Sequence, residues 1–409
     1  MRDPAIRRLM WFFAVVYVVE GIGQAKVGIV WQPLTHFLKQ TQGWDPVQVS
    51  AWLAVLDLPW ILKPLYGIVS DLVPLFGYRR RSYLLVANVA AIAGYAWVAR
   101  TEAPSVLIAA LVLTSVAMAA ASTLCGALLV ENGQRHRASA AFVNQQWLWF
   151  NVALMAASLL GGMLIEWLPS AGALHAAAWI AAVAPVAALA CLPLVHERRA
   201  RIDVPARQRL AALMAAFRSP TLWVIAGFLF CYYFSPGFGT PLYFHMTDRL
   251  GFSQGLIGAL SSVNAAGWIA GGLLYRPLMS RLETGPLLRI SILLGSASTL
   301  AYLGMVDPVS AVVIYFAAGV AGMVANIATL ALAAEHCPEG AEGFAFAALM
   351  SVINLATPVS DMLGSVLYEH VFAERLAPLI VVSAAVTALV LLLLPLLPAR
   401  ADRRRAERA

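Results

Sequence analysis

Charged residues are scarce in this chain. Asp, Glu, Lys and Arg together make up 12% of its 409 residues, whereas an ordinary soluble domain carries about 25%. Apolar residues make up 61%, and segments such as Ile380–Leu394 contain no charge at all. A soluble globular protein is therefore excluded, and the solvent that suits these segments is a lipid bilayer.

Motifs for catalysis and metal binding are absent as well. The sequence has no glycine-rich nucleotide fingerprint, no CxxC pair and no HExxH, and no base, nucleophile and orienting residue at a usable spacing. The four cysteines lie in or beside apolar segments, which indicates neither a disulfide framework nor a metal site. We therefore expect no cofactor, no metal ion and no enzymatic activity.

Breaking the apolar runs at charge clusters, glycines and prolines predicts an all-α membrane protein with twelve transmembrane helices. The predicted helices are 9–38, 47–70, 82–100, 104–130, 140–165, 174–195, 221–247, 254–275, 286–305, 309–334, 343–366 and 378–398. The first is unusually long. Its start, Arg2, Arg7 and Arg8 before Leu9–Val19, is similar to a signal peptide, but no small-residue cleavage site follows, so we expect an uncleaved helix.

Arginines are distributed unevenly over the predicted loops. Most lie on the side of the two termini, in Arg79–Arg81, the segment 198–220 and the tail Arg400–Arg408. The basic residues of the opposite loops are Lys39, Arg100, Arg249 and Arg375. The positive-inside rule then predicts cytoplasmic termini in a plasma membrane, the inner membrane if the source is bacterial. The net charge of +7 is explained by anionic lipid, and we expect no nucleic-acid partner and a monomer.

The segment His196–Pro220 carries six arginines and divides the chain into two halves of six helices. We predict a first bundle at 1–197, a basic cytoplasmic linker at 198–220, and a second bundle with a basic tail at 221–409. Each half also has a Gly-rich basic loop after its second helix, at Gly67–Arg81 and Gly271–Arg281. This architecture resembles the major facilitator superfamily, whose pseudo-symmetric halves rock around a midplane site.

The loop after the second helix also resembles that superfamily's gating motif, G-x-x-x-D-x-x-G-x-[RK]-[RK], with an insertion. The matching residues are Gly67, Asp71, Gly77, Arg79 and Arg80. The resemblance implies a latch in which Gly67 allows close helix approach while Asp71 pairs with an arginine. A loop that only obeys the positive-inside rule is the alternative.

A longer string, Leu58–Leu84, resembles the folate-biopterin transporter family. It matches the pattern W-x-x-K-P-x-x-G-x-x-S-D-x-x-P-x-x-G-x-R-R-x-x-Y from Trp60 and Lys63 to Tyr83, and Ser235–Leu260 is similar to the same family. The resemblance implies a secondary transporter for folate or a pterin. One departure is that Ser122–Val130 lacks the acidic residue that the family carries before its terminal glutamate, here Glu131.

Four charged residues fall inside the first two predicted helices: Glu20, Lys26, Asp57 and Lys63. A charge near the bilayer centre costs at least about 2.5–3.5 kcal/mol, so each needs a partner or a function. A rise of about 1.5 Å per residue in two antiparallel helices places Glu20 level with Lys63 and Lys26 near Asp57. These pairs either fix helix packing, or they bind substrate through Lys63 and Lys26 and carry protons on Glu20 and Asp57.

Asp361 is the mid-span carboxylate of the second half, whose predicted spans hold no lysine or arginine. It must therefore face a cavity, a hydroxyl group or a cation, which makes it a candidate for substrate binding and for proton coupling. In the seventh helix, two prolines and two glycines between Pro236 and Pro241 predict a break that exposes backbone to a cavity.

Aromatic residues near these positions are candidates to stack a planar heterocycle. They are Trp60, Tyr66, Trp147, Tyr232, Tyr233 and Tyr243. For each of them, core packing or contact with lipid is the alternative.

The sequence thus predicts a secondary active transporter that moves a small anionic solute, folate or pterin-like, together with protons. Two alternatives stay open. One is a major facilitator transporter for another organic anion, a siderophore or a sugar. The other is a membrane assembly factor that uses this scaffold without transport.

Overall fold

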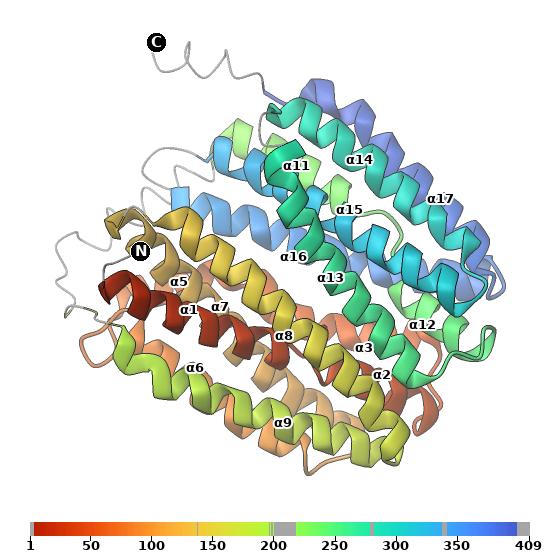
Figure 1. The fold of residues 1–409 in the computed structure, drawn as a ribbon, viewed down its shortest axis with the longest axis horizontal. Coiled ribbons are helices and arrows are strands. Elements are labelled where there is room, and N and C mark those ends of the chain that lie inside the picture. The colour runs from red at the N-terminus through yellow and green to blue at the C-terminus, as the bar shows by residue number, and fades with distance from the viewer. Residues whose placement is uncertain are drawn as a thin grey trace.

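The computed structural model describes residues 4–136, 138–195, 197, 199, 218–278, 282–337 and 342–398. Nearly all of these are helical, and the helices form one elongated bundle (Figure 1). Most of the predicted linker, 198–220, and the basic tail Arg400–Arg408 lie outside the described residues.

The first half of the chain fills the lower part of Figure 1 and the second half the upper part. The first half contains α1 (Pro4–Gly23), α2 (Trp31–Gln40), α3 (Pro46–Ala54), η1 (Val55–Asp57), α4 (Leu58–Ile61), α5 (Lys63–Leu72), α6 (Arg81–Val98), α7 (Pro104–His136), α8 (Ser139–Trp167), α9 (Ser170–Cys191) and η2 (Leu192–Leu194). The second half contains α11 (Pro220–Tyr233), α12 (Gly239–Asp248), α13 (Gln254–Leu278), α14 (Thr284–Ala301), η3 (Tyr302–Gly304), α15 (Pro308–Glu335), α16 (Glu342–Val366), η4 (Leu367–Val371), α17 (Leu376–Leu389) and η5 (Val390–Leu396).

Each predicted span coincides with one helix or with a chain of shorter ones. In the described part of the chain, nine helices are long and apolar enough to cross a membrane. The prediction of an all-helical membrane fold is therefore confirmed, whereas the count of twelve stays a prediction.

The first predicted helix, 9–38, is not continuous, and this prediction was wrong. Helix α1 ends at Gly23, residues 24–30 form turns, and α2 begins at Trp31. Gly28 donates its N–H to Gln24 O at 2.7 Å, and a Cβ at Gly28 would lie 2.8 Å from the same oxygen. Only glycine fits this tight turn, which places Lys26 in unwound backbone at the middle of the bundle.

The second predicted span, 47–70, is helical but irregular. It changes at Val55–Asp57 to a 3-10 turn and again at Leu62, which separates α4 from α5. Pro59 and Pro64 cause this pattern because neither has an N–H to donate to the preceding turn. Asp57 and Lys63 both lie beside these irregularities.

The break predicted in the seventh helix is confirmed: α11 ends at Tyr233 and α12 begins at Gly239. The segment between them packs on α16. Gly237 donates its N–H to Ser360 O at 2.9 Å, and the Ser360 hydroxyl donates to Ser235 O. A Cβ at Gly237 would meet the side chain of Asp361 and lie 3.0 Å from its Cα. A glycine is therefore required where the broken helix touches Asp361.

The buried core is shared by the two halves at one end of the bundle only. We call the end where α1 begins the terminal end, and the other the far end. At the far end, one apolar cluster contains residues of both halves, among them Leu34, Leu111, Tyr243 and Leu379. At the terminal end, each half has a separate cluster, around Phe13 in the first half and around Leu229 in the second.

Polar contacts reinforce the far end. The ammonium of Lys39 pairs with Asp248 and lies 4.5 Å from the centre of the Phe244 ring. Gln32 donates to Gln254 O at 2.8 Å. All of these contacts join the first half to the second, so the far end is closed.

Gly237 and Gly239 provide a matched test of this packing. We expect Gly237→Ala to lower the melting temperature of the purified protein, because overpacking a close contact costs about 1–3 kcal/mol. Gly239→Ala is the control, since a Cβ there meets no atom within 4 Å. Equal melting temperatures of the two variants in detergent would show that the contact with Asp361 is not tight.

Candidate functional site

A cavity of about 320 Å³ lies between the two halves, near the middle of the bundle. Its lining comes from the unwound segment after α1, from α2, α3, α4 and η1, and from α12 and α16 of the second half. The lining residues are Gln24, Lys26, Val27, Trp31, Ser50, Leu53, Asp57, Trp60, Gly239, Thr240, Asn354, Thr357 and Asp361. The volume is at the lower end of the range for small-molecule sites, about 300–1,000 Å³.

Lys26 and Asp57 form an ion pair at the edge of this cavity. The Lys26 Nζ lies 2.5 Å from Asp57 Oδ2, and the two side chains are 21% and 17% exposed. The pair predicted from the helical rise is therefore present. It joins the turn after α1 to η1, and each partner neutralises the charge of the other where both side chains are largely buried.

Asp361 faces the same cavity from α16. Its carboxylate has no hydrogen bond or ion pair with any described residue, although both Lys26 and Asp57 are near enough to act on it electrostatically. The cation that acts on Asp361 is therefore Lys26, a residue of the first half. The cavity brings together one ammonium group and two carboxylates.

The sequence places Glu20 level with Lys63, but these two described side chains form no direct ion pair. Ser122 of α7 lies between them: Lys63 Nζ donates to Ser122 Oγ at 3.2 Å, and Ser122 Oγ donates to Glu20 Oε1 at 2.8 Å. The Lys63 ammonium also lies 4.5 Å from the centre of the Trp60 ring. Lys63 is outside the cavity lining, and Trp60 connects its surroundings to the cavity.

The aromatic candidates are scattered. Trp60 lines the cavity, and its indole N–H donates to Ser115 at 3.1 Å. Trp147 stacks on Trp268 across the α8–α13 contact, with ring centres 6.2 Å apart. The remaining hydroxyls bond elsewhere: Tyr232 to Ser291, Tyr233 to Thr329, and Tyr243 to Gln254. Tyr66 lies on α5, also outside the lining.

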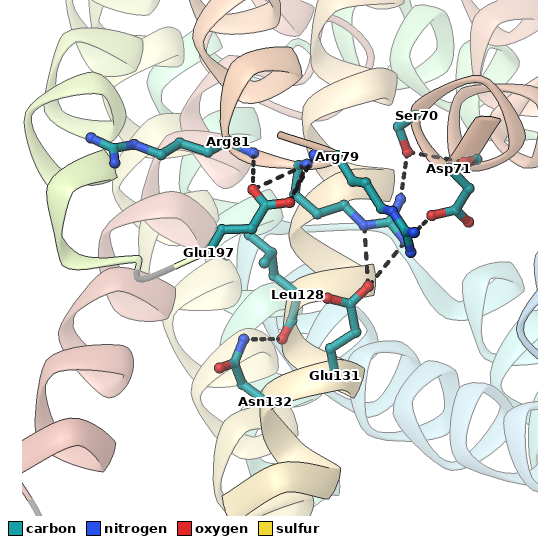
Figure 2. A network of polar contacts seen from close by, with 10 residues as sticks. Ser70, Asp71, Arg79, Arg81, Leu128, Glu131, Asn132 and Glu197 are labelled. Atoms are coloured by element: carbon teal, nitrogen blue, oxygen red, sulfur yellow. Dashed lines mark hydrogen bonds and ion pairs between the residues drawn. The ribbon is translucent and has the colours of Figure 1, made fainter. Parts of the chain in front are cut away.

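Of the predicted latch residues, Asp71 contacts the Arg80 side chain at the terminal end, and Figure 2 shows Ser70, Asp71 and Glu131 gathered in this network. The buried Arg80 guanidinium lies 2.8 Å from Asp71 and 3.0 Å from Glu131, and it also bonds to Ser70. Gly77 has a positive φ of 81° in the turn before α6. A Cβ at Gly67 would meet only Thr123, at 3.9 Å, so the close helix approach expected there is not found.

Glu197 holds the same loop from the end of the first half. Its carboxylate accepts the backbone N–H groups of Arg79, Arg80 and Arg81 at 2.8, 3.0 and 2.8 Å (Figure 2). These N–H groups begin helix α6, whose positive dipole end favours an anion. Arg79 therefore contributes through its backbone here, and the latch contacts described all lie within the first half.

The sequence did not predict the role of three residues in these networks, namely Ser122, Glu131 and Glu197. Ser122 gave no signal, because a serine in a membrane helix usually bonds to its own backbone. The two glutamates gave a weak signal in the sequence. Each is an acid at the end of a span that is followed by arginines.

Comparison with known families gives an extended match. The BT1 family matches residues 22–407. The folate-biopterin transporter of Synechocystis sp. is 29% identical over 409 residues, covering 94% of this chain and 80% of that protein. The probable folate-biopterin transporter 2 of Arabidopsis thaliana is 24% identical over 396 residues, covering 90% of this chain and 78% of that protein.

Solved structures confirm the fold. The crystal structure of a D-xylose-proton symporter superimposes with a TM-score of 0.75 at 15% identity, covering 95% of this chain and 97% of that one. The predicted major facilitator fold is therefore confirmed. The prediction of a transporter rather than an enzyme is confirmed too, since the chain matches the BT1 family and the two relatives are named as transporters.

Arg80 and Arg81 allow a test of the latch contacts. Arg80→Ala should lower the melting temperature, because it removes the bonds of a buried guanidinium group to Ser70, Asp71 and Glu131, and one hydrogen bond contributes about 0.5–1.5 kcal/mol. Arg81→Ala should have little effect, since the bond that Arg81 makes to Glu197 uses its backbone N–H. A similar fall in both variants, measured by thermal unfolding in detergent, would contradict this assignment.

Proposed function

Because the chain belongs to the BT1 family, we propose that it is a secondary active transporter that moves a folate or pterin-like solute by alternating access, coupled to protons. The names of the relatives from Synechocystis and Arabidopsis support this class of cargo. The observation that carries the proposal is the cavity between the halves, where Lys26, Asp57 and Asp361 meet.

The distribution of contacts supports alternating access. The far end is closed by a core that both halves share, while the described core at the terminal end consists of two separate clusters. Opening the far end requires that Lys39 leave Asp248 and that Gln32 leave Gln254. Under this proposal the structure corresponds to one of two states, and the other state closes the terminal end.

The charges at the cavity support the proposed proton coupling. When Asp57 binds a proton, its attraction for Lys26 disappears, and the ammonium group is free to turn toward Asp361 or toward cargo. Loss of that proton restores the pair. Glu20, bonded to Ser122 in the neighbouring network, is the second candidate carrier, and Lys63 is a cation that attracts it.

We further propose the arrangement in the membrane that the arginines predict. The terminal end then faces the cytoplasm, the bundles 1–197 and 221–409 move relative to each other, and the linker 198–220 joins them. The latch around Arg80 is then cytoplasmic. The protein acts as a monomer in the plasma membrane.

Asp57→Asn tests the coupling step. In proteoliposomes with an imposed pH gradient, we expect wild-type protein to accumulate folate or biopterin and the variant to lose this accumulation. Exchange of labelled for unlabelled cargo without a gradient should continue in the variant, because an amide still accepts a hydrogen bond from Lys26.

A matched control is Glu102→Gln, which removes a carboxylate in an exposed loop at the far end. Its accumulation should equal that of the wild type. Normal gradient-driven accumulation by Asp57→Asn would overturn the role of Asp57 in coupling. If the wild-type protein neither accumulates nor exchanges folate, and likewise neither accumulates nor exchanges biopterin, the proposed cargo is wrong.

A further inference from the structure

The charges of the cavity do not suit a carboxylate ligand. Lys26 is its basic residue and already pairs with Asp57, while Asp361 adds a second carboxylate. A folate molecule carries its negative charges on the glutamate tail and none on the pteridine ring. The cavity therefore suits the ring, which is neutral and bears hydrogen-bond donors, better than the tail.

The α16 side of the cavity is a row of acceptors. Asn354, Thr357 and Asp361 lie on one face of the helix because their spacing follows the helical repeat. The Asn354 amide nitrogen donates to Trp60 O at 2.9 Å, and the Thr357 hydroxyl donates to Ile353 O at 3.1 Å. Their oxygens are left as acceptors, beside a carboxylate that has no hydrogen-bond partner among the described residues.

The first half supplies the complement to this row. Lys26 brings a donor to the cavity, and the side chains of Trp31 and Trp60 bring aromatic surface. Asp361 is held in place by the Gly237 contact and by the bonds between the broken helix and Ser360. The acceptor row is thus built on backbone that is fixed from two sides.

We propose that Asp361 is the residue that determines specificity, by binding the 2-amino and N3–H donors of a pterin ring in a bidentate manner. Two parallel donors match the two oxygens of a carboxylate, as in arginine–carboxylate pairs. The 4-oxo group beside N3 then accepts a hydrogen bond from Lys26, and the glutamate tail of folate stays outside the cavity. This inference rests on the proposed function and names the pterin ring as the part of the cargo that the cavity binds.

Three probes separate ring from tail: pterin, lumazine, which has an oxo group in place of the 2-amino group, and p-aminobenzoylglutamate, which is the tail alone. Titration calorimetry on the purified protein should show that pterin binds about 10–100-fold more tightly than lumazine, because lumazine sets an acceptor against the carboxylate. The tail compound should not compete with pterin.

Asp361→Asn is the informative variant. An amide has one acceptor and one donor group, so we expect weaker binding of pterin and loss of the preference over lumazine. Glu102→Gln is the control and should keep both affinities. Melting temperatures of both variants, compared with the wild type, verify that they are folded.

The outcomes separate the two proposals. Equal binding of pterin and lumazine by the wild type, or a preference that survives in Asp361→Asn, overturns the role of Asp361 while transport of folate or biopterin still stands. Competition by p-aminobenzoylglutamate overturns the placement of the tail outside the cavity. A wild-type protein that binds neither folate nor pterin overturns both this inference and the proposed cargo.

Discussion

The ion pair between Lys26 and Asp57 determines how the first half of the bundle is built. An ammonium group at mid-depth is costly unless a carboxylate is within reach, and Asp57 lies 2.5 Å away. To form this contact, helix α1 has to end at Gly23 and continue as the turn that Gly28 permits. The second span changes to a 3-10 turn at the level of its partner. The pair and the two irregular segments therefore belong to one arrangement, whose exposed side forms the wall of the cavity.

The same relation between charge and broken helix recurs in the second half. Asp361 lies against the segment that separates α11 from α12, and Gly237 gives that segment room to touch it. Irregular backbone at membrane depth is tolerated only where protein buries it or where it lines a cavity. Here Ser360 bonds to the backbone of both Ser235 and Gly237, and the cavity lies beside Gly239 and Thr240 at the start of α12. Each half thus contributes an interrupted helix and at least one carboxylate to the lining of the same cavity, and the first half contributes two such interrupted spans.

The sequence predicted those features that depend on distance along a helix or on residue type. The contact of Lys26 with Asp57 followed from the helical rise, and the break near Gly237 from its prolines and glycines. The continuous first helix was wrong, because the effect of Gly28 depends on which carbonyls its turn faces. Glu20 and Lys63 are connected only through a residue of a third helix, Ser122 of α7. No pattern within the first two spans reveals this bridge. The tyrosines illustrate the same limit, since the helix that receives each hydroxyl is a property of the packing.

The two ends of the bundle are held by different kinds of contact, and this difference bears on the proposed exchange of states. At the far end, apolar side chains of both halves share a core, with ion pairs such as Lys39–Asp248 around it. At the terminal end, the polar network of Arg80 and Glu197 stays inside the first half. It therefore stiffens that half without joining it to the other. An opening of the far end must expose apolar surface, so the second state needs a compensating contact at the terminal end. The Arg80 network, with the half-exposed carboxylates of Asp71 and Glu131 at its rim, offers charged groups at that end for such a contact.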